Sequence, residues 1–148
     1  MSFFSSFKKW QPYSISLVRI GLAIVFLWFG INQLLFPSTF MGYVPSWAIQ
    51  GGGGMMGNMI HNMIMVIPHP ATSLLYFNGI IEIMFGIMML FGIYTRLSAV
   101  VLAIHLVIIT ISLGYNDVAV RDFGLALATA SIFLHGPDRL CLDKDKKD

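Results

Sequence analysis

Residues 15–36 read ISLVRIGLAIVFLWFGINQLLF, an apolar run in which Arg19 is the only charged residue. A helix rises about 1.5 Å per residue, so roughly 20 residues cross the ~30 Å hydrocarbon core of a bilayer. We expect three further spans, at residues 72–94, 97–113 and 118–134. The last of these has the shortest uncharged core, and we expect neighbouring helices to cover it. The pattern predicts an all-α fold, a polytopic membrane four-helix bundle in a single domain.

Apolar side chains dominate the composition. Hydrophobic residues make up 57% of the 148 residues and charged residues 11%, whereas soluble domains carry about 25% charged residues. The net charge of +2, without a basic patch interleaved with aromatic residues, excludes nucleic acid as a partner. We therefore expect a multi-pass protein of the cell membrane that contacts lipid, with its first helix kept as an uncleaved anchor.

The sequence offers few redox-active groups of its own. Cys141 is the only cysteine, which excludes a cysteine pair, a cysteine zinc site and an intramolecular disulfide. The sequence also has no haem, flavin or iron–sulfur motif. Any redox chemistry therefore requires a bound quinone, a copper ion or a partner subunit.

Basic residues predict the orientation in the membrane. With four spans, the N-terminus, the 95–96 turn and the tail at 135–148 share one side. That side holds Lys8, Lys9, Arg96, Arg139, Lys144, Lys146 and Lys147. The opposite side holds Arg121 alone, so the positive-inside rule places both termini in the cytoplasm. We expect the last six residues, Asp143–Asp148, to be solvated and disordered.

The segment between the first two spans, residues 37–70, is expected to form an extracytoplasmic loop rich in methionine. Its thioether and imidazole side chains are Met55, Met59, His61, Met63, Met65 and His69. One interpretation is an interfacial or re-entrant helix over Met55–Ile67 that caps the bundle, because methionine suits irregular packing. The other is a copper(I) site, because thioether and imidazole ligands favour Cu(I) and three methionines recur every four residues.

Ionisable side chains inside a span are costly and usually face the bundle interior, so they are the first candidates for function. Glu82 lies near the middle of the second span and shares a helical stripe with Gly79 and Gly86, with Asn78 one turn away. His105 lies at a similar depth in the third span. Because these spans form a hairpin, we expect Glu82 and His105 to meet near the midplane. The pair would relay protons or hydrogen-bond a quinone head group, or else form a structural interhelical hydrogen bond.

Further polar residues lie nearer the two interfaces. Arg19 is about one turn inside the first span, where it either snorkels to the interface or pairs towards the second-span glutamate. Arg121 and Asp122 begin the fourth span, and an aspartate there favours the positive end of the helix dipole. We expect this pair mainly to cap and anchor the helix, with Asp117, Asn32 or an anionic ligand as the alternative partners of Arg121. This places Asn32, Arg121 and Asp122 at the outer mouth of the bundle.

Three segments give the chain a resemblance to a known family. They are SLVRIGLAIVFLWFGINQLLFPSTFMGYVP at 16–45, GIIEIMFGIMMLFGIYTRLSAVVLAI at 79–104 and VRDFGLALATASIFLHGPDRLCLD at 120–143. In this order and spacing, the chain resembles the DoxX/DoxD family of small four-helix membrane proteins. The resemblance implies a place near membrane redox chemistry, because some members resemble the large subunit of a thiosulfate:quinone oxidoreductase and others are linked to oxidative-stress complexes. The resemblance also implies that the family's polar positions correspond to Arg19, Glu82, Arg121 and Asp122 in this chain, with His105 as a weaker match.

Three functions fit these observations. The first is an accessory or structural subunit of a membrane oxidoreductase complex, without catalytic residues and with little activity alone. The second is a quinone-linked oxidoreductase subunit of the thiosulfate:quinone type, in which Glu82 and His105 manage protons beside the quinone. The third is a copper-handling protein that uses the Met55–His69 segment to serve a copper oxidase or monooxygenase.

Overall fold

The computed structural model describes residues 8–52 and 54–143, and this part of the chain is helical without any strand. A short 3-10 helix, η1 (Gln11–Tyr13), precedes the first long helix. The four long helices are α2 (Ser14–Leu35), α6 (Pro70–Phe91), α7 (Thr95–Leu113) and α8 (Asp117–His135). Each is long and apolar enough to cross a membrane. The prediction of an all-α protein with four apolar helices is confirmed.

The helix ends follow local sequence signals. α2 ends because Phe36 precedes Pro37, and a residue before proline is driven out of the helical region, here to φ −133° and ψ 58°. α6 ends at Gly92, which adopts a left-handed φ of 64° that favours glycine. Asn116 caps α8, since its side-chain oxygen accepts a hydrogen bond from the Ala119 N–H at 2.8 Å.

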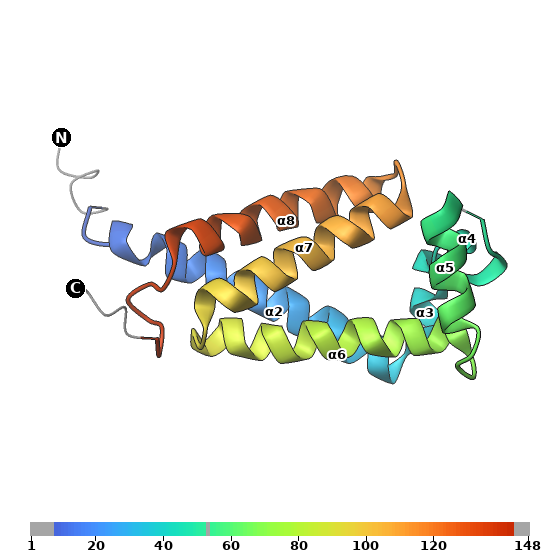
Figure 1. Ribbon diagram of the computed structural model, residues 1–148. Helices are drawn as coiled ribbons and strands as arrows, with labels where there is room; N and C mark the ends of the chain where they lie inside the picture. The colour runs from blue at the N-terminus through green and yellow to red at the C-terminus, as the bar shows by residue number, and fades with distance from the viewer. Residues whose placement is uncertain (1–7, 53, 144–148) are drawn as a thin grey trace.

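The four helices form two antiparallel pairs. α2 packs mainly against α6 and α7 mainly against α8, while α6 and α7 diverge from the tight turn that joins them (Figure 1). α2 and α6 approach closely at Gly30 and Gly79, where a Cβ added to either residue would lie 2.8 Å from the carbonyl oxygen of the other. The stripe of Gly79, Glu82 and Gly86 is buried, as predicted. Small residues thus hold Glu82 against α2.

One end of the bundle, which we call the tail end, holds the start of α2 and the finish of α8 (Figure 1). Here the residues after α8 fold back against the α6–α7 turn. Leu142 N donates to the Phe91 carbonyl at 3.1 Å, and Asp143 N donates to the Gly92 carbonyl at 2.8 Å. The prediction of a solvated tail is therefore wrong for Asp143, and its other residues, 144–148, lie outside the described part of the chain.

The opposite end, which we call the loop end, carries short helices. These are α3 (Pro37–Phe40), the 3-10 helix η2 (Met41–Tyr43), α4 (Ser46–Gln50) and α5 (Gly54–Ile64). α4 and α5 lie beyond the ends of the long helices, and α5 runs across them rather than along them (Figure 1). The expected helix in the Met-rich segment is therefore present, although it ends at Ile64 rather than Ile67.

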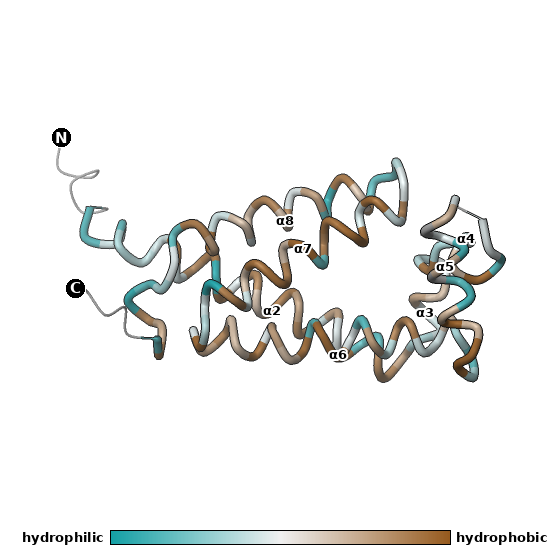
Figure 2. Tube along the Cα trace, in the orientation of Figure 1, coloured by the Kyte–Doolittle hydropathy of each residue, from teal (hydrophilic) through white to brown (hydrophobic). Residues whose placement is uncertain are grey.

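Apolar residues run along the whole length of the four long helices (Figure 2). Many large apolar side chains on them point outward, including Leu17, Ile24, Trp28, Ile80, Ile104, Ile111 and Leu127. The inner core is smaller and centres on Leu22, Phe26, Met89 and Leu102. An outer surface this apolar suits lipid rather than water.

Candidate functional site

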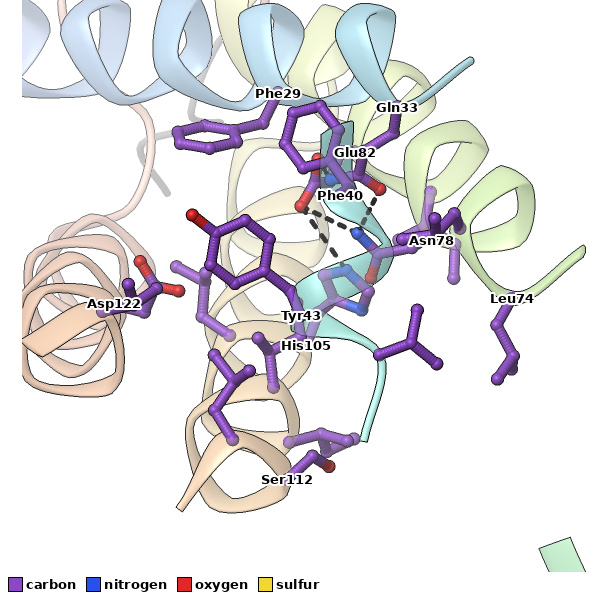
Figure 3. Close-up of a pocket in the computed structure, with 18 of the residues that line it drawn as sticks. Phe29, Gln33, Phe40, Tyr43, Leu74, Asn78, Glu82, His105, Ser112 and Asp122 are labelled. Carbon is purple, nitrogen blue, oxygen red and sulfur yellow. Dashed lines mark hydrogen bonds and ion pairs between the residues drawn. The ribbon is translucent and has the colours of Figure 1, made fainter. Parts of the chain in front are cut away.

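A group of polar side chains lies where α2 and α6 meet (Figure 3). Gln33 Nε2 donates to Glu82 Oε2 at 3.1 Å, and Asn78 Nδ2 donates to Glu82 Oε1 at 3.2 Å. Asn78 Nδ2 also donates to Gln33 Oε1 at 2.6 Å. Glu82 is only 4% exposed. Because a buried carboxyl group without partners is costly, the two amides stabilise Glu82 in its place.

His105 faces Glu82 from α7. Its Nε2 lies 3.8 Å from Glu82 Oε1, which is too long for a hydrogen bond. This nitrogen is buried and has no hydrogen-bond partner among the residues that the structure describes. The two residues therefore come together as the hairpin predicts, but without a direct hydrogen bond. We call Gln33, Asn78, Glu82 and His105 the cavity cluster.

A cavity of about 430 Å³ lies beside this cluster. All four long helices line it, and residues of η2 and α4 line its loop end. Its aromatic side chains are Phe26, Phe29, Phe40, Tyr43, Trp47 and Phe77. Small-molecule sites typically enclose roughly 300–1,000 Å³, with apolar walls and a few convergent polar groups. The cavity fits that description.

Asp122 lines the same cavity from α8 and is bound by Arg121. Arg121 Nε and Nη2 lie 2.9 and 2.8 Å from Asp122 Oδ1. The guanidinium carbon of Arg121 lies 5.2 Å from the centre of the Phe29 ring, a cation–π distance. Arg121 thus contacts Asp122 and Phe29 rather than Asp117 or Asn32. Asn32 donates to a carbonyl one turn earlier in its own helix and does not line the cavity.

Arg19 belongs to a second polar group, which we call the tail-end cluster: Ser16, Arg19 and Asp138. Arg19 Nε donates to Asp138 Oδ2 at 2.6 Å, and Ser16 Oγ donates to Asp138 Oδ1 at 2.7 Å. Arg19 Nη1 donates to the carbonyls of Met89 and Leu90. Arg19 is fully buried, so both predicted roles, snorkelling and pairing with the second-span glutamate, are wrong. The reason is that the chain after α8 turns back and brings a carboxylate to Arg19.

The ionisation of Asp138 follows from these contacts. Burial alone would raise the pKa of Asp138, but hydrogen bonds from Arg19, Ser16 and the Leu140 N–H favour the charged carboxylate. Together with the charge of Arg19, they lower the pKa of Asp138 from 3.8 to about 2. Asp138 is therefore ionised at neutral pH and keeps Arg19 paired.

Most candidate copper ligands are exposed at the loop end, and one of them bonds the backbone. Met55, Met59 and Met63 are 91%, 67% and 67% exposed along α5. His61 instead bonds the Ala48 carbonyl through Nδ1 at 3.1 Å. Met65 and His69 follow α5 and are also exposed. Among the described residues there is no group of three or more His, Cys, Asp or Glu suited to a metal. Copper binding by the methionines stays a prediction.

Sequence reasoning missed several residues of the site. Gln33 was expected at the outer end of an inward stripe with Arg19 and Gly30, and it is buried, but its bond to Glu82 was not predicted. Phe40 and Tyr43 line the cavity from a segment that carries no clear periodicity. Asp138 is far from Arg19 in the chain, and nothing local marks it as a partner.

The family model of DoxX matches residues 14–114 of the chain. The chain belongs to the DoxX family. The match runs from α2 to the end of α7 and so includes Arg19, Glu82 and His105, whereas α8 and the folded-back tail follow it. No curated protein and no solved structure matches the chain. DoxX membership and the four apolar helices establish a multi-pass protein of the cell membrane.

Proposed function

We propose that this DoxX protein is a subunit of a membrane oxidoreductase complex and that its cavity binds the head group of a quinone. The proposal rests on one observation above all: the buried Nε2 of His105 faces Glu82 beside an aromatic-lined cavity and bonds no described residue. A quinone head group is a flat apolar ring with two carbonyl oxygens. It therefore needs apolar walls and a small number of polar groups.

The side chains of the cavity fit such a head group. Phe29, Phe40 and Tyr43 provide flat apolar surfaces. In the tautomer that carries its proton on Nε2, His105 can donate a hydrogen bond to a quinone oxygen. Glu82 and His105, 3.8 Å apart, can each hold or release a proton beside that oxygen. A bound quinone would supply the two-electron chemistry that these side chains lack.

The subunit role follows from the source of electrons. The chain has one cysteine and no haem, flavin or iron–sulfur motif, so electrons for the quinone would come from a partner protein. A small reductant such as thiosulfate is one electron source for that partner. The outward apolar side chains of the long helices provide surface for lipid and for partner helices.

The charge distribution supports one orientation. Among the described residues, Lys8, Lys9, Arg96 and Arg139 flank the helices on the tail-end side and Arg121 lies near the loop end, while three more lysines follow Asp143 in the sequence. By the positive-inside rule, the tail end faces the cytoplasm and the Met-rich α5 faces outward.

Quinone binding tests the proposal directly. Purified tagged protein in detergent is titrated with a tritium-labelled short-chain quinone in a scintillation proximity assay. Saturable binding is expected for the wild type, and the double variant Glu82→Gln, His105→Ala is expected to weaken it by at least about tenfold, since the carboxyl group and the imidazole are both removed. Asn32→Leu is the matched control, because Asn32 is an amide of the same bundle that does not line the cavity. Wild-type affinity in the double variant would overturn the assignment.

The subunit role is tested on native membranes. Gentle extraction, native gel separation and mass spectrometry of the band that holds this chain should identify oxidoreductase subunits in the same band. Migration of the chain alone, or as a small homo-oligomer, would contradict the subunit role and leave the binding result standing.

A further inference from the structure

We propose that the cavity opens sideways to the lipid between α6 and α7 and that this opening holds the isoprenoid chain of the bound quinone. The inference rests on the proposed function and adds to it the position of the apolar part of the ligand. It follows from helix packing, from the exposure of two lining residues and from the polar groups that lie on the other routes out of the cavity.

Packing leaves α6 and α7 apart at the loop end. These helices follow each other through a tight turn at the tail end, yet they pack together less than α2 with α6 or α7 with α8. Figure 1 shows the two helices diverging as they run from that turn. The bundle is therefore wedge-shaped on this side, and the cavity occupies the wide part of the wedge.

Two residues mark the edge of the opening. Phe77 of α6 and Ile108 of α7 both line the cavity, yet they are 64% and 58% exposed. Their side chains contact both the cavity and the outer surface of α6 and α7, as residues at an opening between these helices would. Phe77 precedes Glu82 by five residues and Ile108 follows His105 by three. The mouth thus lies about one to two helical turns from the polar head-group site.

Other routes suit an apolar chain less well. Between α2 and α8, Arg121 bonds Asp122 and lies over the Phe29 ring, which places a charged pair in that gap. At the loop end, a neighbouring hollow is lined in part by Ser112, Asn116 and Asp117. A charged pair and a partly polar hollow favour water or small polar groups. The apolar mouth, continuous with the lipid-facing surface, favours an isoprenoid chain.

The test compares two probes: a benzoquinone without a side chain, and the same quinone with a decyl chain. Phe77→Trp and Ile108→Trp narrow the mouth with a bulkier ring. They are expected to weaken decyl-quinone binding at least about fivefold while leaving the chainless quinone within about twofold, since the lost contacts are with methylene groups. Ile80→Trp and Ile111→Trp are the controls, because both residues are exposed on the same helices and neither lines the cavity. All variants use the same detergent, so partition of the probe into micelles cancels.

Each outcome bears on the proposal. Equal weakening of both probes, or equal effects in the control variants, would overturn the mouth between α6 and α7 but not the head-group site. If added phospholipid displaces the decyl quinone, and Phe77→Trp weakens that competition as it weakens decyl-quinone binding, the opening would be assigned to a lipid acyl chain instead. Absence of saturable chainless binding to the wild type would overturn the proposed function itself. Should a tryptophan variant fail to fold, Phe77→Ala and Ile108→Ala remove chain contacts and should selectively weaken the decyl probe.

Discussion

The tail-end cluster and the cavity cluster each bury chargeable side chains in the same bundle, but their hydrogen bonding differs. In the tail-end cluster, Arg19 has Asp138 and two backbone carbonyls as partners, and Asp138 also accepts from Ser16. In the cavity cluster, Glu82 has two amide donors, but the Nε2 of His105 bonds no described residue. The first group is closed and fully paired, whereas the second is left incomplete beside an open volume.

Under the proposed function, this difference separates a structural cluster from a binding cluster. A buried ion pair with satisfied hydrogen bonds fixes the relative positions of the segments that carry it. The tail-end cluster thereby ties α2, α6 and the chain after α8 together. A buried polar atom without a partner costs free energy, and the cost is recovered when a ligand bonds it. Under the proposed function, the cavity cluster is less stabilising than the tail-end cluster until a quinone bonds His105.

The largest effect is expected from removing the acid of the tail-end cluster. Asp138→Ala leaves the Arg19 guanidinium buried without its counter-ion, and breaking a buried pair in this way costs about 3–5 kcal/mol. Thermal unfolding of the purified protein, followed by circular dichroism in one detergent, measures the loss. A change within about 0.5 kcal/mol, as for an ordinary surface substitution, would show that the pair does not hold the bundle together.

The pH dependence of unfolding checks the same pair independently. The folded-state pKa of Asp138 is about 2, below its ordinary value of 3.8. Folding therefore favours the charged carboxylate, so this stabilisation is present above about pH 4 and is lost as the pH falls to about 2. The wild type should lose stability across that window by more than Asp138→Asn, which cannot titrate. Parallel pH profiles for the two proteins would contradict the assigned pairing.

A smaller effect is expected at the α2–α6 contact that supports the cavity cluster. In Gly30→Ala, the new Cβ would lie 2.8 Å from the Gly79 carbonyl oxygen, so the helices must separate. Overpacking of this kind costs about 1–3 kcal/mol. Because Gln33 lies one turn away, its bond to Glu82 should also weaken, and quinone affinity should fall.

Gly21→Ala provides the matched control for this contact. Gly21 lies in the same helix, and an added Cβ there meets nothing within 4 Å. Since alanine is a better helix former than glycine, this change should be neutral or stabilise by up to about 1 kcal/mol. Equal effects of the two substitutions in unfolding experiments would show that the Gly30–Gly79 approach is not tight.

The fold was predictable because each long helix is marked by its own residues. Uninterrupted hydrophobicity located the spans, and the glycine stripe oriented Glu82 towards the interior. The meeting of Glu82 with His105 followed from one more step, the short hairpin between their helices. These inferences need only local periodicity and chain connectivity.

The rest of the site depends on contacts between distant segments. Asp138 reaches Arg19 because the chain reverses after α8 at Gly136, which has a φ of 82°. Neither residue carries a local sign of that reversal. Phe40 and Tyr43 reach the cavity from short helices whose packing on α6 no repeat in the sequence indicates. Tertiary packing, rather than propensity, places both sets of residues.

The smallest effect on stability is expected from Glu82→Gln in the cavity cluster. It is compared with Asp138→Asn, the same type of substitution in the tail-end cluster. Both substitutions replace a buried carboxyl group by an amide of nearly the same shape. At Asp138 the change leaves Arg19 without an anionic partner and should cost at least about 2 kcal/mol. At Glu82 the new amide oxygen can still accept from Asn78, so the free energy of unfolding should change by less than about 1 kcal/mol. Unfolding of the two variants side by side in one detergent measures the contrast. Equal losses would mean that Glu82, like Asp138, serves mainly to hold the helices together, and the separation of the two clusters into structural and binding roles would then be wrong.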